Sequence, residues 1–103
     1  MGLRIDQSIM NEVIAVEVIF IGRVQGVGFR ATCQQLAQAY RLVGFVKNMP
    51  DGSVQLWAQA EQDEIEAYFR EIQKSRLGSL VINQNNSLRK VDSTLKSFEI
   101  RYF

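Results

Sequence analysis

The spacing of apolar residues separates strands from helices along the first three quarters of the chain. Val13 to Ile21 is nearly all apolar and rich in β-branched residues, which predicts a central strand. From Phe29 to Tyr40 the apolar residues recur every three or four positions, which predicts a helix with one buried face. Asp63 to Lys74 shows the same spacing and predicts a second helix.

A hairpin is predicted between the two helices. Its strands are Leu42 to Lys47 and Ser53 to Ala60, and in the second of them every other residue is apolar. Met49 to Gly52 predicts the turn, because proline fixes φ and glycine accepts a positive φ.

In the last third of the chain, the sequence does not decide the position of the fourth strand. Leu80 to Asn83 and Leu88 to Ser93 compete for the fourth strand, Asn83 to Asn86 is expected to be a polar loop, and Ser97 to Tyr102 predicts a final strand. The order β-α-β-β-α-β predicts an α+β, ferredoxin-like fold, an antiparallel sheet with two helices on one face. In that fold the first and second strands are parallel with the third between them, so their C-terminal ends meet at one edge.

The domain is expected to span residues 13–103, after an extension of residues 1–12 that shows little periodicity. At 103 residues and a net charge of +1, one small domain is expected, with no strong attraction to nucleic acid or membrane. No apolar stretch reaches about 18 residues, so a cytoplasmic protein is expected. We also expect a monomer.

Histidine is absent from the chain and Cys33 is the single cysteine. Catalytic Ser-His-Asp and Cys-His arrangements are therefore excluded, and no cluster of zinc ligands is available. Cys33 falls on the apolar face of the first predicted helix, so it is expected to be buried in the core. Neither a metal nor an organic cofactor is expected.

A glycine-rich stretch stands where the first strand gives way to the first helix. Gly22, Gly26 and Gly28 precede Arg30, which falls in the first turn of the helix. Glycine lets backbone N–H groups turn toward one point, and a helix start adds unpaired donors. This pattern predicts a cradle for an anion such as phosphate, with the Arg30 guanidinium as a planar fork. A dinucleotide fingerprint is disfavoured, because the acidic residue expected about 20 positions later is missing.

A second stretch, Gly44 to Val54, makes this interpretation more specific. Taken together in this order, the two stretches resemble the acylphosphatase family, over roughly residues 14–60 and a final strand at 98–102. Two departures from the family pattern are Met49, where relatives often have Ser or Thr, and Ala60, where they usually have Gly.

The resemblance implies an acylphosphatase, a hydrolase that converts a small acyl phosphate to a carboxylate and inorganic phosphate. It implies that Arg30 binds phosphate and that Asn48, whose side chain both donates and accepts, positions the attacking water. The expected phosphate-binding segment is Val24, Gln25, Gly26, Val27, Gly28, Phe29 and Arg30.

Other interpretations remain open at this point. Arg30 could be a solvated surface arginine, and Asn48 could simply open a turn. A non-catalytic binding module is a second hypothesis, since similar domains occur fused to hydrogenase-maturation proteins. RNA binding is a third, because many RNA-recognition domains share the strand order. It is disfavoured because Trp57 is the single aromatic candidate on the third strand.

Overall fold

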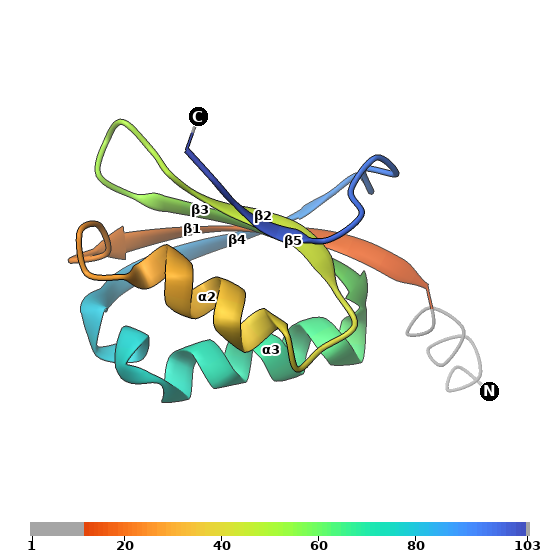
Figure 1. Ribbon diagram of the computed structural model, residues 1–103, viewed down its shortest axis with the longest axis horizontal. Coiled ribbons are helices and arrows are strands. Elements are labelled where there is room, and N and C mark those ends of the chain that lie inside the picture. Colours follow the sequence, from red (N-terminus) through yellow and green to blue (C-terminus); the bar gives the residue numbers. More distant parts are fainter. Residues whose placement is uncertain (1–11, 103) are drawn as a thin grey trace.

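A computed structural model describes residues 12–102, which form a five-stranded sheet with two helices against one face (Figure 1). The elements follow one another as β1 (Val13–Gly22), α2 (Phe29–Ala37), β2 (Val43–Asn48), β3 (Val54–Glu61), α3 (Gln62–Lys74), the 3₁₀ helix η1 (Arg76–Leu80), β4 (Val81–Arg89) and β5 (Phe98–Arg101). The expected extension lies outside the described residues except for Glu12, as does Phe103.

The strands lie in the order β4-β1-β3-β2-β5. β3 is antiparallel to both β1 and β2, so β1 and β2 run the same way with β3 between them. The ferredoxin-like α+β fold is therefore confirmed. β5 adds a strand parallel to β2, which makes the sheet mixed rather than purely antiparallel.

The fourth strand is longer than either interpretation of the sequence. β4 runs continuously through residues 83–86, so the prediction of a polar loop there is wrong. Its backbone pairs with β1, with Asn86 opposite Val18 and Gln84 opposite Phe20. The polar side chains are tolerated because β4 is an edge strand whose residues stay solvated.

The remaining element boundaries agree with the prediction to within three residues. The largest difference is at α2, which ends at Ala37 instead of Tyr40. The amides of Gln38, Ala39 and Tyr40 each bond the carbonyl three residues earlier, so the chain tightens into a turn before β2 begins.

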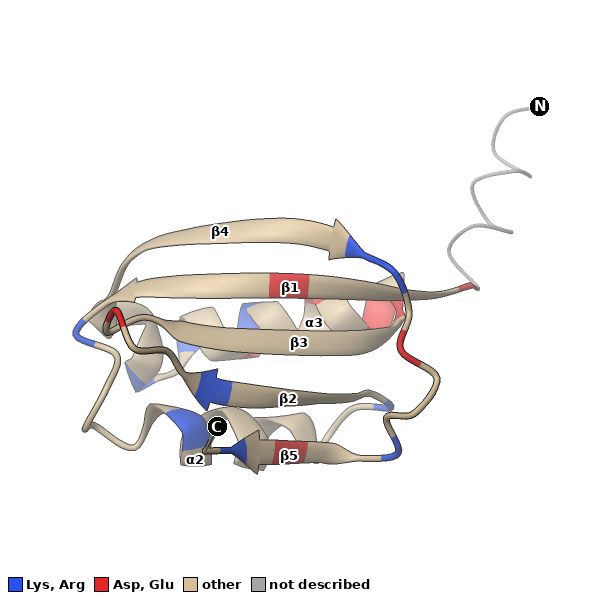
Figure 2. Ribbon diagram, turned by 90° about the horizontal axis from the view of Figure 1, so that it is seen from above, with Lys and Arg blue, Asp and Glu red and all other residues tan. Residues whose placement is uncertain are grey.

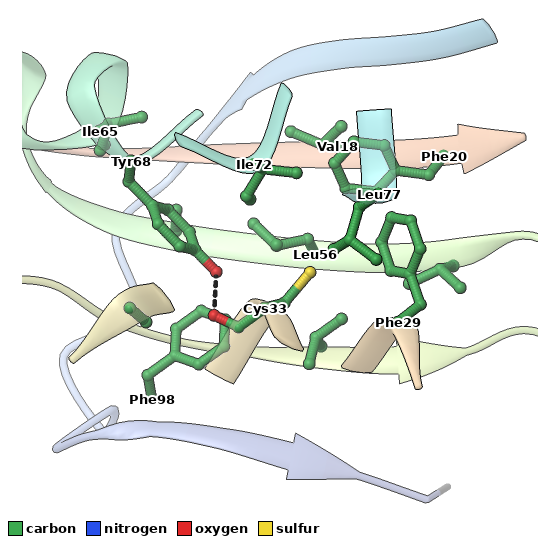
Figure 3. Close-up of a cluster of buried hydrophobic side chains, with 14 of the residues drawn as sticks. Val18, Phe20, Phe29, Cys33, Leu56, Ile65, Tyr68, Ile72, Leu77 and Phe98 are labelled. Carbon is green, nitrogen blue, oxygen red and sulfur yellow. Dashed lines mark hydrogen bonds between the residues drawn. The ribbon is translucent and has the colours of Figure 1, made fainter. Parts of the chain in front are cut away.

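Both helices contribute to one core against the sheet, with Leu77 of η1 inserted beside them (Figure 3). Tyr68 of α3 is fully buried, and its hydroxyl donates a 2.7 Å hydrogen bond to the Cys33 carbonyl of α2. The Cys33 thiol is buried as expected, and burial raises its pKa to about 12. The core therefore fixes α2, whose first turn borders the candidate site.

Within residues 12–102, no helix combines the length and apolar character needed to cross a membrane.

Candidate functional site

The loop between β1 and α2 turns on two glycines in the left-handed region. Gly26 has φ 76° and Gly28 has φ 75°, values that other residues rarely adopt. A side chain at Gly26 would meet nothing within 4 Å, so backbone conformation alone explains that glycine. Gly28 caps α2 without a side-chain hydrogen bond.

The loop leaves backbone donors without partners. No amide between Val24 and Gly28 donates to a backbone carbonyl of residues 12–102, and the first helical bond of α2 is made by the Thr32 amide to the Gly28 carbonyl at 3.1 Å. The preceding amides of the first turn therefore remain free, as at any helix start. The first turn holds no acidic residue, so the positive end of the helix dipole is not neutralised locally.

Arg30 stands in that first turn and reaches the end of β5. Its Nη1 donates to the Arg101 carbonyl at 3.4 Å, and its guanidinium carbon lies 4.8 Å from the centre of the Tyr102 ring. Across residues 12–102, no carboxylate forms a salt bridge with Arg30. The guanidinium is thus held in place while its charge stays available.

Arg30 and Asn48 border the same hollow, which measures about 180 Å³. Asn48 is the last residue of β2, and its register partner Val54 is fully buried. The walls come from the loop and first turn of α2, the end of β2 and the end of β5: Val24, Gly26, Gly28, Phe29, Arg30, Ala31, Asn48, Ile100 and Tyr102. Gln25 and Val27, both in the expected segment, do not line it.

Gln25 connects the loop to the β2–β3 turn. Its Nε2 donates to the carbonyls of Met49 and Ser53, each at 2.8 Å. The turn itself is closed by Asp51, which accepts from the Ser53 hydroxyl and amide at 2.6 and 2.9 Å. These two bonds lower the pKa of the Asp51 carboxyl. Gln25 thereby holds the β1–α2 loop against the turn that follows Asn48.

Arg76 of η1 holds the other side of the loop, and no motif in the sequence predicted this role. Its Nη2 donates to the Val27 carbonyl at 2.8 Å and to the Thr32 hydroxyl at 3.2 Å. The Val27 side chain packs against the hydrophobic core. Arg76 follows α3 in a stretch without any recognisable motif, and the fold alone brings it to the loop.

Several basic residues lie at this end of the molecule, although one of them, Arg101, is paired with Glu99 at 3.1 Å. Figure 2 shows basic segments on α2, β2 and β5, which are neighbouring elements. Lys47 and Arg101 are register partners, although neither lines the hollow. Arg101 lies over the Phe45 ring, with its guanidinium carbon 4.1 Å from the ring centre.

The hollow offers little for proton transfer by side chains. Arg30 and Tyr102 are the titratable residues in its described walls, and the chain has no histidine. Nowhere in residues 12–102 do three or more His, Cys, Asp or Glu side chains form a group that could hold a metal ion. The arrangement is suited to holding an anion and orienting a neutral molecule beside it.

The two departures from the family pattern have different settings. Met49 takes part through its backbone, as its amide donates to the Ser53 carbonyl at 2.9 Å and its carbonyl accepts from Gln25. Ala60 is buried opposite Ile14 of β1, at the end of β3 far from the turn. Neither setting removes a group that lines the hollow.

A family model for acylphosphatases matches residues 16–100 of this chain. An acylphosphatase from Methanospirillum hungatei is 36% identical over 86 residues, which cover 84% of this chain and 94% of that one. One from Clostridium acetobutylicum is 39% identical over 85 residues, covering 80% and 90%.

Solved structures give the same result. The acylphosphatase of Bacillus subtilis superposes with a TM-score of 0.77 at 29% identity, over 86% of this chain and 99% of that one. Full-length HypF, in a phosphate- and nucleotide-bound form, superposes with a TM-score of 0.80 at 30% identity, over 87% of this chain and 12% of that protein. The predicted class of enzyme, a hydrolase of the acylphosphatase type, is confirmed by these relatives, and the chain belongs to the acylphosphatase family.

Proposed function

We propose that this chain hydrolyses acyl phosphates to a carboxylate and inorganic phosphate, with the phosphoryl group bound in the small hollow. Acyl phosphate hydrolysis itself is supported by family and fold. The observation that carries the residue roles is that the glycine loop, Arg30 and Asn48, which come from two separate segments, border one hollow.

The phosphoryl group is proposed to sit at the start of α2. The free amides of the loop and first turn donate to its oxygens, and the Arg30 guanidinium adds two parallel donors and a full positive charge. Because phosphoryl transfer is mostly positioning and charge stabilisation, these groups supply the main part of catalysis.

Asn48 is proposed to orient the attacking water. Its carboxamide oxygen accepts one hydrogen of the water, which leaves the water's lone pair free to attack phosphorus. The bond between phosphorus and the bridging oxygen breaks, and that oxygen leaves as a stable carboxylate. The second proton of the water passes to a phosphate oxygen or to solvent, so the step requires no acidic or basic side chain.

One chain supplies every residue in this scheme, so a single chain is the proposed catalytic unit. We propose that it acts in the cytoplasm on a small-molecule acyl phosphate, releases inorganic phosphate, and requires neither metal nor organic cofactor. Phosphate as product is expected to compete with substrate for the same hollow.

The test is hydrolysis of benzoyl phosphate in the presence of a chelator. Asn48→Ala is expected to lower kcat by about 100-fold while inhibition by inorganic phosphate persists, and Arg30→Ala is expected to lose both turnover and phosphate inhibition. Full turnover by Asn48→Ala would show that the proposed role is wrong. Asn85→Ala, on the remote strand β4, is the matched control and should keep the parental rate.

A second candidate function, binding without turnover, is favoured by the similarity to a segment of full-length HypF. It predicts phosphate binding by the parental protein with no release of benzoate. RNA binding is not supported in the same way. Phe45 is only 8% exposed beneath Arg101 and stacks on Trp57 with the ring centres 6.0 Å apart, which leaves little aromatic surface for bases.

A further inference from the structure

Among residues 12–102, no strand pairs with the outer edge of β4, which is nine residues long. β4 pairs with β1 on one side only, and the opposite edge of the sheet, β5, has four residues. An edge strand presents a row of backbone N–H and C=O groups that can pair with another strand. Edge strands in soluble proteins are usually short or carry charged side chains, both of which discourage such pairing.

β4 lacks that charge protection over most of its length. From Val81 to Leu88 it carries no charged side chain, and Arg89 at its end is paired with Glu17 of β1 at 2.9 Å. Two of its large apolar side chains are strongly exposed, Ile82 at 81% and Leu88 at 72%. A strand edge with this composition is suited to a partner rather than to water.

The apolar side chains of β4 lie on the helix side of the sheet, beyond the cover of α3. Leu88 is paired with Val16, which packs against the core. Ile82 lines a hollow of about 410 Å³ between α3, η1 and β4, together with Gln84 and Asn86. α3 therefore leaves this side of β4 open.

We propose that β4 pairs with β4 of a second copy of this chain, antiparallel, with the two Asn85 residues opposite each other. This proposal departs from the monomer expected from the sequence. In this register Ile82 of each copy lies opposite Leu88 of the other, and Gln84 lies opposite Asn86. Two apolar pairs and the central amides then match, while Asn83 lies opposite Ser87 and Val81 opposite Arg89, so no two like charges are opposed. The pattern of the strand is thus complementary to itself, which favours a second copy over an unrelated segment.

The dimer closes on itself, because a two-fold interface uses the same edge of both copies. The two sheets join into a continuous ten-stranded sheet with a β5 edge at each end. No residue that lines the small hollow belongs to β4, and β1 and β3 lie between β4 and the strand that carries Asn48.

The proposal can be tested by introducing a charged residue at the centre of the interface. We expect the parental protein to change from monomer to dimer as its concentration rises in sedimentation equilibrium. Asn85→Lys and Asn85→Glu should each weaken dimerisation several-fold, because like charges then face each other across the two-fold axis. An equimolar mixture of the two variants should restore it. Ser93→Lys and Ser93→Glu carry the same charges outside β4 and should dimerise like the parent.

Two outcomes would overturn the proposal. One is a parental chain that stays monomeric at every concentration. The other is a mixture of Asn85→Lys and Asn85→Glu that dimerises no better than either variant alone. Hydrolysis of benzoyl phosphate per chain, measured in dilute solution, should be the same for all four variants and the parent. This readout shows that each variant is folded, and its result does not depend on the residue roles proposed for the small hollow.

Discussion

Two hollows on the helix side of the sheet differ in size and in the chemistry of their walls. The larger, of about 410 Å³, lies between α3, η1 and β4, and its walls are mainly apolar side chains and amides. The smaller, of about 180 Å³, lies at the start of α2 and has the glycine loop, Arg30 and Asn48 in its walls.

The difference shows that backbone geometry, rather than volume, is what supports the proposed anion site. The small hollow is bordered by the N-terminus of α2, where free amides and the positive end of the helix dipole favour an anion. The large hollow is bordered by Ile72 and Gln73 in the last turn of α3, where the negative end of the helix dipole disfavours an anion. Arg70 contributes a positive charge there, but no comparable set of backbone donors accompanies it.

The largest expected difference between the two hollows comes from one conservative substitution in the wall of each. Arg30→Lys keeps the charge but loses the planar fork and the stacking on Tyr102, so kcat/KM for benzoyl phosphate should fall by about 100-fold. Arg70→Lys makes the same change in the wall of the large hollow and should leave kcat/KM unaltered. Equal rates for the two variants would contradict the assignment of the phosphate to the small hollow.

A smaller effect is expected from the residue that holds the loop to the turn. Gln25→Leu removes both hydrogen bonds to the Met49 and Ser53 carbonyls, so the loop and Asn48 lose their fixed separation. We expect kcat to fall by about tenfold, because misplacement of reacting groups is costly. Each lost bond should also lower the free energy of unfolding by about 1 kcal/mol.

Gln55→Leu is the matched control for the loss of stability. It removes a glutamine hydrogen bond of 2.6 Å to Glu17 on the face of the sheet away from the helices. Stability should fall by thermal unfolding while kcat stays unchanged. If Gln25→Leu and Gln55→Leu reduce stability but neither reduces kcat, Gln25 does not position the site.

Local patterns predicted most of the fold because the responsible interactions are local. Alternation in Ser53 to Ala60 and the helical spacing in Asp63 to Lys74 each identified an element to within a residue at either end. The full extent of β4 was not predicted because its polar side chains resemble a loop, while the pairing that makes it a strand comes from β1, 59 to 74 residues away. Long-range backbone pairing leaves no periodic signal in an edge strand.

The site was predictable to a similar degree. The glycine loop and Arg30 are contiguous in sequence, and the strand order brought Asn48 to the same hollow as expected. Tyr102 and Arg76 were missed, because they approach Arg30 and the loop through the fold alone. The roles of the loop amides, Arg30 and Asn48 in catalysis stay predictions until the variants are measured.

The smallest expected effect comes from filling the large hollow. Gln73→Trp places an indole against that hollow near the end of α3, where no phosphoryl group is proposed to bind. The rate on benzoyl phosphate should therefore change by less than about twofold, since surface changes away from a site are usually near neutral. Ala31→Trp puts the same side chain against the small hollow and should abolish inhibition by phosphate together with turnover. A rate loss in Gln73→Trp equal to that in Ala31→Trp would contradict the proposed phosphate site and would favour the larger hollow instead.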